Sequence, residues 1–237
     1  MQGKALALEP FSSVIKWNAE GEMTSNRSFD MRSRQLVCAL VSGLVVLAAC
    51  HGKAQERKKD AGKLAALLNW QPGSVVAEIG AGDGDMTLAA ADLVGPTGRV
   101  YTTELEPAKL AKLQSLASEH KNIIAVKAGQ AETNLPPGCC DSIFMRRVYH
   151  HFTDPEKEDA SLFQSLKPGG LLAVIDFQPG EGPGDSKLPK GVPKNRGGHG
   201  MPKQLLIEEL TAAGFQVEAS PADWSAPDYC VVFKKSK

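Results

Sequence analysis

The fold of this chain is decided by Val75-Val-Ala-Glu-Ile-Gly-Ala-Gly-Asp-Gly-Asp-Met-Thr87. A short apolar run, 75–79, leads at once into glycines at alternate positions, and an alanine-rich segment of helical character follows. This order predicts a strand, a tight turn and the start of a helix. Glycine permits positive φ and a close approach of a ligand to the backbone, because no Cβ stands in the way. The turn is therefore predicted to hold a flat ligand against bare backbone.

The composition is that of a globular protein without excess charge. Of 237 residues 42% are apolar, and 27 Lys and Arg residues balance 27 Asp and Glu residues. We expect one main domain with a substantial core. A net charge of +0 provides no general attraction for a polyanion, so we expect no nucleic-acid partner. The five cysteines form no CxxC pair, which disfavours structural zinc, and we expect no metal site.

The first 50 residues differ in character from the rest. Residues 1–30 are polar without a period and are predicted to be disordered. From Met31, arginines precede an uncharged run, 36–50, which is shorter than the ~20 apolar residues of a membrane-spanning helix. Residues 31–50 are therefore predicted to be a signal peptide. An uncleaved membrane anchor is the alternative, because the basic residues that follow tend to stay on the cytoplasmic side.

The end of the uncharged run, Leu47-Ala-Ala-Cys50, resembles a bacterial lipoprotein box, in which cleavage precedes a cysteine that receives lipid. We expect a location in the cell envelope, periplasmic or membrane-anchored, if residues 31–50 are used, and a cytoplasmic location otherwise. No feature of the sequence specifies an oligomeric state.

Helical and strand patterns alternate from residue 55 onward. Strands are predicted at 75–79, 99–104, 123–126, 140–145, 171–176, 215–219 and 229–233, and helices at 55–70, 85–94, 107–119, 155–166 and 201–213. The last two strands are joined by a hairpin-length connection and should be antiparallel. The alternation predicts an α/β fold with a doubly wound, mostly parallel seven-stranded sheet.

Ligands of such a sheet bind at the carboxyl ends of its strands. A dinucleotide fingerprint, G-x-G-x-x-G, would have its third glycine at Asp85. Asp83 and Asp85 at the helix mouth should repel a diphosphate, which disfavours a nicotinamide-dependent oxidoreductase. A cationic cofactor without phosphate fits better.

Three motifs resemble one enzyme family. Glu78-Ile-Gly80-Ala-Gly82-Asp-Gly84 resembles the first motif of class I S-adenosylmethionine-dependent methyltransferases, which binds the amino-acid end of the cofactor. Val-Tyr-Thr-Thr-Glu104 is similar to the second motif, whose acid accepts hydrogen bonds from the ribose hydroxyls. Leu166-Lys-Pro-Gly-Gly170 is similar to the approach to the fifth strand. The resemblance covers roughly Lys58 to Lys235 and implies a Rossmann-like methyltransferase domain over residues 55–237, with an antiparallel last strand.

The resemblance also implies the residues that bind the cofactor. Many relatives carry an aspartate that contacts the adenine amino group. Gln130 stands at the matching position, and its amide oxygen can accept from the same amine. Arg146 and Arg147 are candidates to receive an anionic acceptor. The residues expected to hold S-adenosylmethionine are Glu78, Gly80, Gly82, Gly84, Glu104, Gln130 and Arg146.

The segment Tyr149-His150-His151-Phe152 contains the candidate catalytic residues, His151, His150 and Tyr149. Its His-His-Phe sequence resembles small-molecule methyltransferases such as the quinone and sterol groups. A neutral histidine can act as a base where the acceptor must lose a proton. Alternatively, one histidine packs beneath the cofactor, and Tyr149 forms a wall of the pocket.

Other interpretations of function and of the long loop stay open. Cys139 and Cys140 could bind a metalloid, as in some arsenic methyltransferases, although adjacent strand side chains point to opposite faces. The Gly/Pro-rich segment 178–200 is predicted to be a lid, a binding loop or disordered, with His199 either touching substrate or exposed.

We expect transfer of the methyl group of S-adenosylmethionine to a small-molecule acceptor that lies beneath this loop. Because S-adenosylmethionine is made in the cytoplasm, an exported protein would lack a supply. The alternative function is a non-catalytic ligand-binding lipoprotein with a methyltransferase-like fold.

Overall fold

The computed structural model describes residues 55–184 and 187–236. These residues belong to one compact unit that runs from Gly52 to Lys237. The predictions for residues 1–30 and 31–50 fall outside the described residues. Within the described ranges, no helix combines the length and the apolarity that crossing a bilayer requires.

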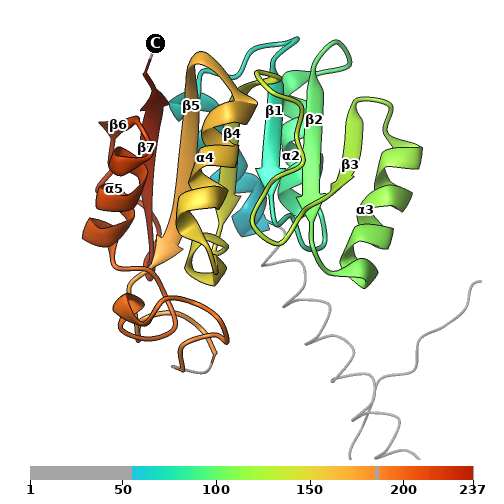
Figure 1. Cartoon of the computed structure of the whole chain (residues 1–237). Coiled ribbons are helices and arrows are strands. Elements are labelled where there is room, and N and C mark those ends of the chain that lie inside the picture. The colour runs from blue at the N-terminus through green and yellow to red at the C-terminus, as the bar shows by residue number, and fades with distance from the viewer. Residues whose placement is uncertain (1–54, 185–186, 237) are drawn as a thin grey trace, which may run out of the picture. The chain divides into compact units, whose positions relative to one another are not determined.

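A seven-stranded sheet forms the centre of the unit, in the order β3-β2-β1-β4-β5-β7-β6 (Figure 1). The first five strands run parallel, and β7 runs antiparallel to both β5 and β6. The strand bounds are β1 (Val75–Ile79), β2 (Arg99–Glu104), β3 (Ile123–Lys127), β4 (Cys140–Arg146), β5 (Leu166–Phe177), β6 (Phe215–Ala219) and β7 (Asp228–Lys235). The predicted doubly wound, mostly parallel sheet with an antiparallel last strand is confirmed.

Helices cover both faces of the sheet. In Figure 1, α4 and α5 lie in front of the strands, and α2 lies behind β1 and β2. The helix bounds are α2 (Asp85–Val94), α3 (Pro107–Glu119), α4 (Pro155–Ser165) and α5 (Lys203–Ala212), and residues 55–67 are also helical. All five predicted helices are therefore present, with small differences at their ends.

Two apolar clusters fill the space between sheet and helices. Successive residues of β4 alternate between them, because strand side chains point to opposite faces in turn. Phe144 packs in the cluster with α2 and the helix at 55–67, whereas Ile143 and Met145 pack in the cluster with α4 and α5. This burial on both faces fixes the register of the sheet. The register in turn fixes where each strand ends relative to its neighbours.

The main difference from the predicted elements lies at the start of β5. The sequence predicts a helix that ends at 166 and a strand that starts at 171, but β5 begins at Leu166. Leu166 pairs with Cys140, the register then shifts, and Leu171 pairs with Ser142. Gly169 has a φ of 74°, which accommodates the extra residues as a bulge. The residues between the predicted helix and the predicted strand are thus part of a bulged strand.

The segment between β5 and α5 leaves and returns at the carboxyl end of β5 (Figure 1). It contains a short 3-10 helix, η2 (Lys194–Arg196). Backbone hydrogen bonds from Met201 N to Phe177 O, 2.8 Å, and from Gly180 N to His199 O, 3.4 Å, join its two ends. The segment therefore lies at the edge where the strands are expected to present a ligand site.

Candidate active site

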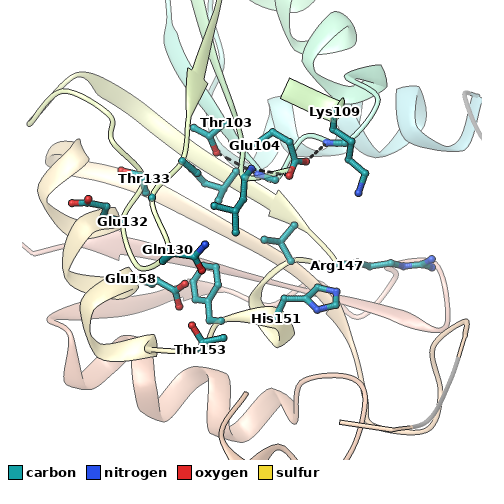
Figure 2. A pocket seen from close by; sticks show the side chains of 18 residues that line it. Thr103, Glu104, Lys109, Gln130, Glu132, Thr133, Arg147, His151, Thr153 and Glu158 are labelled. Atoms are coloured by element: carbon teal, nitrogen blue, oxygen red, sulfur yellow. Dashed lines mark hydrogen bonds between the residues drawn. The ribbon is translucent and has the colours of Figure 1, made fainter. Parts of the chain in front are cut away.

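A cavity of about 350 Å³ opens at the carboxyl ends of β1, β2, β3 and β4 (Figure 2). The strand order reverses between β1 and β4, so the cavity occupies the switch point at which open α/β sheets bind ligands. Its walls are formed by Ile79, Gly80, Gly82, Thr103, Glu104, Leu105, Lys109, Ala128, Gly129, Gln130, Glu132, Thr133, Arg147, Val148, His151, Phe152, Thr153 and Glu158.

The glycine turn after β1 forms one wall. Gly80 and Gly82 have φ angles of 65° and 59°, which L side chains rarely adopt. A Cβ on Gly80 would lie 2.7 Å from Val148 Cγ2, whereas a Cβ on Gly82 would meet no atom within 4 Å. Gly80 thus permits close packing within the protein, and Gly82 leaves open space at the wall of the cavity. This bare backbone fits the predicted site for the amino-acid end of a cofactor.

Glu104 holds its carboxylate against this turn. Its Oε2 accepts a hydrogen bond from Gly82 N at 3.0 Å, and its Oε1 accepts one from Leu105 N at 2.8 Å (Figure 2). Thr103 Oγ1 accepts from Gly80 N at 3.4 Å. The end of β2 and the turn after β1 are therefore joined into one rigid unit, which presents a carboxylate to the cavity.

Two residues of the same motif point away from the cavity. Glu78 is only 4% exposed, accepts a hydrogen bond from Thr87 Oγ1, and burial raises its pKa to about 8. Gly84 precedes α2 with a φ of 83°, and a Cβ there would lie 2.9 Å from Leu116 Cδ2. Both residues shape the start of α2, and neither lines the cavity. Any part they play in cofactor binding is indirect.

Asp83 and Asp85 do not line the cavity either. Asp83 pairs with Lys112 at 2.8 Å, and Asp85 pairs with Arg57. These partners offset the repulsion of a diphosphate expected from the two acids. The cavity itself is lined by acidic and basic side chains. Three carboxylates, Glu104, Glu132 and Glu158, line it with two cations, Lys109 and Arg147.

Gln130 lines the cavity, as predicted, in the connection that follows β3. In Figure 2 it lies across the cavity from Glu104. Glu104 and Gln130 are thus placed at two sides of one space, as contacts to the ribose and to the base of a nucleoside require. Of the seven predicted cofactor residues, the structure brings Gly80, Gly82, Glu104 and Gln130 together here.

The two arginines after β4 diverge. Arg146 lies outside the cavity and pairs with Asp60 Oδ2 at 3.2 Å and with Asp228 Oδ2 at 3.0 Å. Arg147 adopts a left-handed φ of 57° and lines the cavity, with its Nε 2.8 Å from Asp228 Oδ1. Arg147, rather than Arg146, is therefore positioned to meet a ligand.

Tyr149 begins the short 3-10 helix η1 (Tyr149–His151) and is fully buried outside the cavity. Its hydroxyl lies 2.8 Å from Asp159 Oδ2 and 2.9 Å from Glu209 Oε2. Burial raises the pKa of Tyr149 well above its ordinary value and raises the pKa of Asp159 to about 7. In this arrangement the hydroxyl joins η1 to α4 and α5, at a distance from any ligand in the cavity.

The two histidines of η1 also differ. His150 is 2% exposed and lies behind the cavity wall, with its Nδ1 2.8 Å from Asp176 Oδ1. His151 lines the cavity. Desolvation, with His150 and His199 nearby, lowers the pKa of His151 to about 4. The imidazole of His151 is thus neutral at pH 7, but it is a weak base there.

Glu158, in α4, was missed by the sequence analysis. It lines the cavity, burial raises its pKa to about 8, and its Oε2 has no hydrogen-bond partner among the described residues. The only sequence signal is its place in the first turn of a helix that opens with Asp154 and Pro155. A pKa near neutrality suits a group that exchanges a proton with a ligand.

Cys139 and Cys140 stand at the amino end of β4, away from the cavity at its carboxyl end. Cys140 is fully buried, and its pKa is raised by the neighbouring Cys139 thiol and by burial. A metalloid bound there would lie at the opposite edge of the sheet from the glycine turn. The position therefore disfavours the metalloid alternative.

The chain is similar to known methyltransferases. Residues 77–174 match the family model described as "Methyltransferase domain". The ubiquinone/menaquinone biosynthesis C-methyltransferase UbiE of Psychromonas ingrahamii is 32% identical over 109 residues, which cover 44% of this chain and 43% of that protein. The aligned part is thus less than half the length of this curated relative.

Solved structures show the same fold. An S-adenosylmethionine-dependent methyltransferase from Aquifex aeolicus matches with a TM-score of 0.59 and 23% identity, over 74% of this chain and 88% of that chain. The trans-methyltransferase CalH, in complex with S-adenosylhomocysteine, matches with a TM-score of 0.58 and 19% identity, over 70% of this chain and 52% of that chain. The predicted Rossmann-like methyltransferase fold is confirmed, and the domain match supports S-adenosylmethionine as the cofactor.

Proposed function

We propose that this chain is an S-adenosylmethionine-dependent methyltransferase that acts on a small-molecule acceptor. The observation that carries the proposal is the pairing of the Gly82 backbone with the Glu104 carboxylate, 3.0 Å apart, at the wall of the cavity. This pairing combines bare backbone with a fixed acid, which are the two features that the family resemblance requires of the cofactor site.

The residues present fit that cofactor. The open space beside Gly82 would receive its amino-acid end, Glu104 would accept hydrogen bonds from its ribose hydroxyls, and Gln130 would meet its adenine. When bound, the cofactor supplies an activated methyl group on a sulfonium.

The wall around Arg147 and His151 would bind the acceptor, because these two residues lie away from Gln130 in Figure 2, whereas Glu158 lies beside it. Positioning two reactants in one cavity accounts for much of the rate of a transfer reaction. With its pKa near 8, Glu158 is mostly protonated at pH 7 and can donate a hydrogen bond to a ligand near Gln130. His151, with a pKa near 4, serves better as a neutral wall than as a base.

Calorimetric titration of the full chain with S-adenosylhomocysteine tests the cofactor part of this proposal. Glu104→Gln keeps the shape of the side chain but removes its charge, and we expect affinity to fall by roughly 10- to 100-fold, since hydrogen bonds to charged groups contribute about 1.5–3 kcal/mol. Glu106→Gln is the matched control. Glu106 is a neighbouring surface carboxylate that pairs with Lys109 at 2.8 Å and does not line the cavity, so affinity should change less than about twofold.

No binding of the wild-type chain to S-adenosylhomocysteine or S-adenosylmethionine at millimolar concentration would contradict the proposal and support the non-catalytic ligand-binding lipoprotein instead. Where binding is found, release of S-adenosylhomocysteine from S-adenosylmethionine in the presence of candidate acceptors, quinone precursors among them, tests catalysis.

We also propose that residues 31–50 direct the chain to the cell envelope as a signal peptide or membrane anchor. The support is the sequence pattern of two arginines, an uncharged run and Leu47-Ala-Ala-Cys50. Mass spectrometry of the mature protein checks this. A lipid-modified Cys50 at the N-terminus is expected, and an intact, unmodified Met1 on a soluble protein would overturn it.

A further inference from the structure

Three histidines meet beside the cavity, two from η1 and one from the long segment that follows β5. One ring nitrogen of each of His150, His151 and His199 lies within 4.8 Å of the others. The ring centroids of His150 and His151 are 4.0 Å apart, and those of His150 and His199 are 4.7 Å apart. This histidine cluster is assembled by the return of the loop, since His199 is far from the other two in sequence.

His150 is oriented as a metal-binding histidine is. Its Nδ1 lies 2.8 Å from Asp176 Oδ1, and the same carboxylate accepts hydrogen bonds from Phe177 N at 2.9 Å and from His150 N at 3.2 Å. Asp176 is fully buried, so the carboxylate favours the tautomer in which Nδ1 carries the hydrogen. The lone pair is then on Nε2. A histidine whose second nitrogen donates to a carboxylate is the usual arrangement behind a metal ligand.

The lone pair of His150 points into the protein without a partner. Nε2 of His150 is buried and has no hydrogen-bond partner among the described residues. A buried polar atom in this condition requires an explanation, because almost all such atoms are satisfied. The other two imidazoles of the histidine cluster are close by, since one ring nitrogen of each of the three residues lies within 4.8 Å of the others.

We propose that His150, His151 and His199 bind a divalent transition-metal ion of the zinc class. Imidazole nitrogens suit zinc, copper, iron and nickel. Zinc bound by three histidines keeps a fourth position for water or a substrate, with Zn–N distances of about 2.0–2.1 Å. At those distances tetrahedral ligand nitrogens lie roughly 3.3 Å apart, so the observed spacing needs only small side-chain rotations.

The backbone already brings His199 to this position. Gly180 N donates to His199 O at 3.4 Å, and Met201 N donates to Phe177 O at 2.8 Å, so both sides of His199 are tied to the end of β5. A Cβ on Gly200 would lie 2.8 Å from Pro179 N, which shows how closely the two ends of the loop pack. The ion would therefore join a loop and η1 that are already adjacent.

The position of the ion relative to the cavity follows from His151, which is both a member of the histidine cluster and part of the cavity wall. An ion bound there would place its open position near the wall that the proposed function assigns to the acceptor. Metal binding itself does not depend on methyltransferase activity, so the two proposals can fail separately.

Metal titration of the full chain tests the inference. After chelator treatment and dialysis, Zn²⁺ is titrated by calorimetry and Co²⁺ by its visible absorption. We expect one equivalent to bind and His199→Ala to weaken binding at least tenfold. His120→Ala is the matched control, because His120 follows α3 and lies outside the histidine cluster, and its affinity should change less than twofold.

Thermal unfolding provides the second measurement. Zn²⁺ should raise the Tm of the wild type and of His120→Ala, but not that of His199→Ala, because a ligand stabilises only the form that binds it. If His199→Ala fails to fold, the same test can be made with His151→Ala, which replaces an exposed side chain. An absence of stoichiometric Zn²⁺ binding would overturn the inference. It would also be overturned if Zn²⁺ binding were unchanged in His199→Ala and His151→Ala but abolished by alkylation of the thiols.

Discussion

The two ends of the cavity are built in different ways. At the glycine-turn end (Gly80, Gly82, Glu104), backbone groups and one carboxylate from two adjacent strands fix each other through local contacts. At the post-β4 end (residues 146–153), the side chains are held by partners from distant segments, as Arg146 is by Asp228 and His150 by Asp176. The first end depends on a short motif and the second on the completed fold. Substitutions should therefore affect affinity at one end and stability at the other.

The largest effect is expected for Arg146→Met. This change leaves Asp60, whose side chain is 3% exposed, without its arginine partner, and it leaves Asp228, whose side chain is 2% exposed, with Arg147 alone. Breaking a buried pair costs about 3–5 kcal/mol, so the free energy of unfolding in urea should fall by about 3 kcal/mol, with affinity for S-adenosylhomocysteine unchanged. Arg147→Met is the control and should cost less than about 1 kcal/mol, because Arg147 is more exposed. A large loss of affinity with intact stability would instead support the cofactor role that the sequence assigns to Arg146.

Tyr149→Phe should come next. It removes the hydroxyl that lies beside both Asp159 and Glu209, and a loss of about 2 kcal/mol of unfolding free energy is expected, since the buried Asp159 carboxyl loses its hydrogen-bond partner. Tyr229→Phe removes a single bond to Met201 O, 2.7 Å, and should cost about 1 kcal/mol. If Tyr149→Phe abolished turnover without loss of stability, the catalytic role predicted from the sequence would be supported. The contrast drawn between the two ends of the cavity would then be contradicted.

Gly82→Ala tests the glycine-turn end, and Gly138→Ala is its matched control. Their φ angles are 59° and 61°, and a Cβ would meet no atom within 4 Å at either position. Both variants should lose about 1–2 kcal/mol of stability to the left-handed backbone. Only Gly82 lines the cavity, so only Gly82→Ala should weaken S-adenosylhomocysteine binding, by about tenfold or 1.4 kcal/mol. Equal affinities of the two variants for S-adenosylhomocysteine would show that Gly82 is not part of the ligand site.

The smallest effect is expected for Glu158→Gln. Because the pKa of Glu158 is about 8 in the folded chain and 4.5 in the reference state, the folded state binds more protons between these values. The contribution of Glu158 to stability therefore decreases as pH rises from about 4.5 to about 8. Urea unfolding at several pH values should show a shallower decrease for Glu158→Gln, by less than about 1 kcal/mol per pH unit, since the carboxylate is only part-buried. Identical slopes for the two proteins would show that Glu158 titrates normally.

The same contrast explains what the sequence could predict. Strand order and the positions of Gly80, Gly82 and Glu104 follow from alternation and local turn chemistry, which act over a few residues. Glu78 and Gly84 belong to the same motif, yet they face α2 and α3, because neighbouring positions in a strand or turn point in different directions.

The remaining site residues could not be predicted because they depend on contacts between distant segments. Arg146 and Arg147 have the same side chain, and the left-handed φ at Arg147, 57°, places only the second in the cavity wall. Glu158 reaches the cavity through the placement of α4, and His199 reaches η1 through the return of a long loop. No periodicity or spacing in the sequence specifies either.

The position of β7 has a consequence for how the chain is made. This strand, Asp228–Lys235, is the last along the sequence but lies between β5 and β6, with hydrogen bonds to both. During synthesis, β5 and β6 therefore lack their common neighbour until β7 has been made. Until then, the edges of β5 and β6 present unpaired backbone groups, which can pair with another chain. The insertion of β7 therefore covers two strand edges that would otherwise favour aggregation.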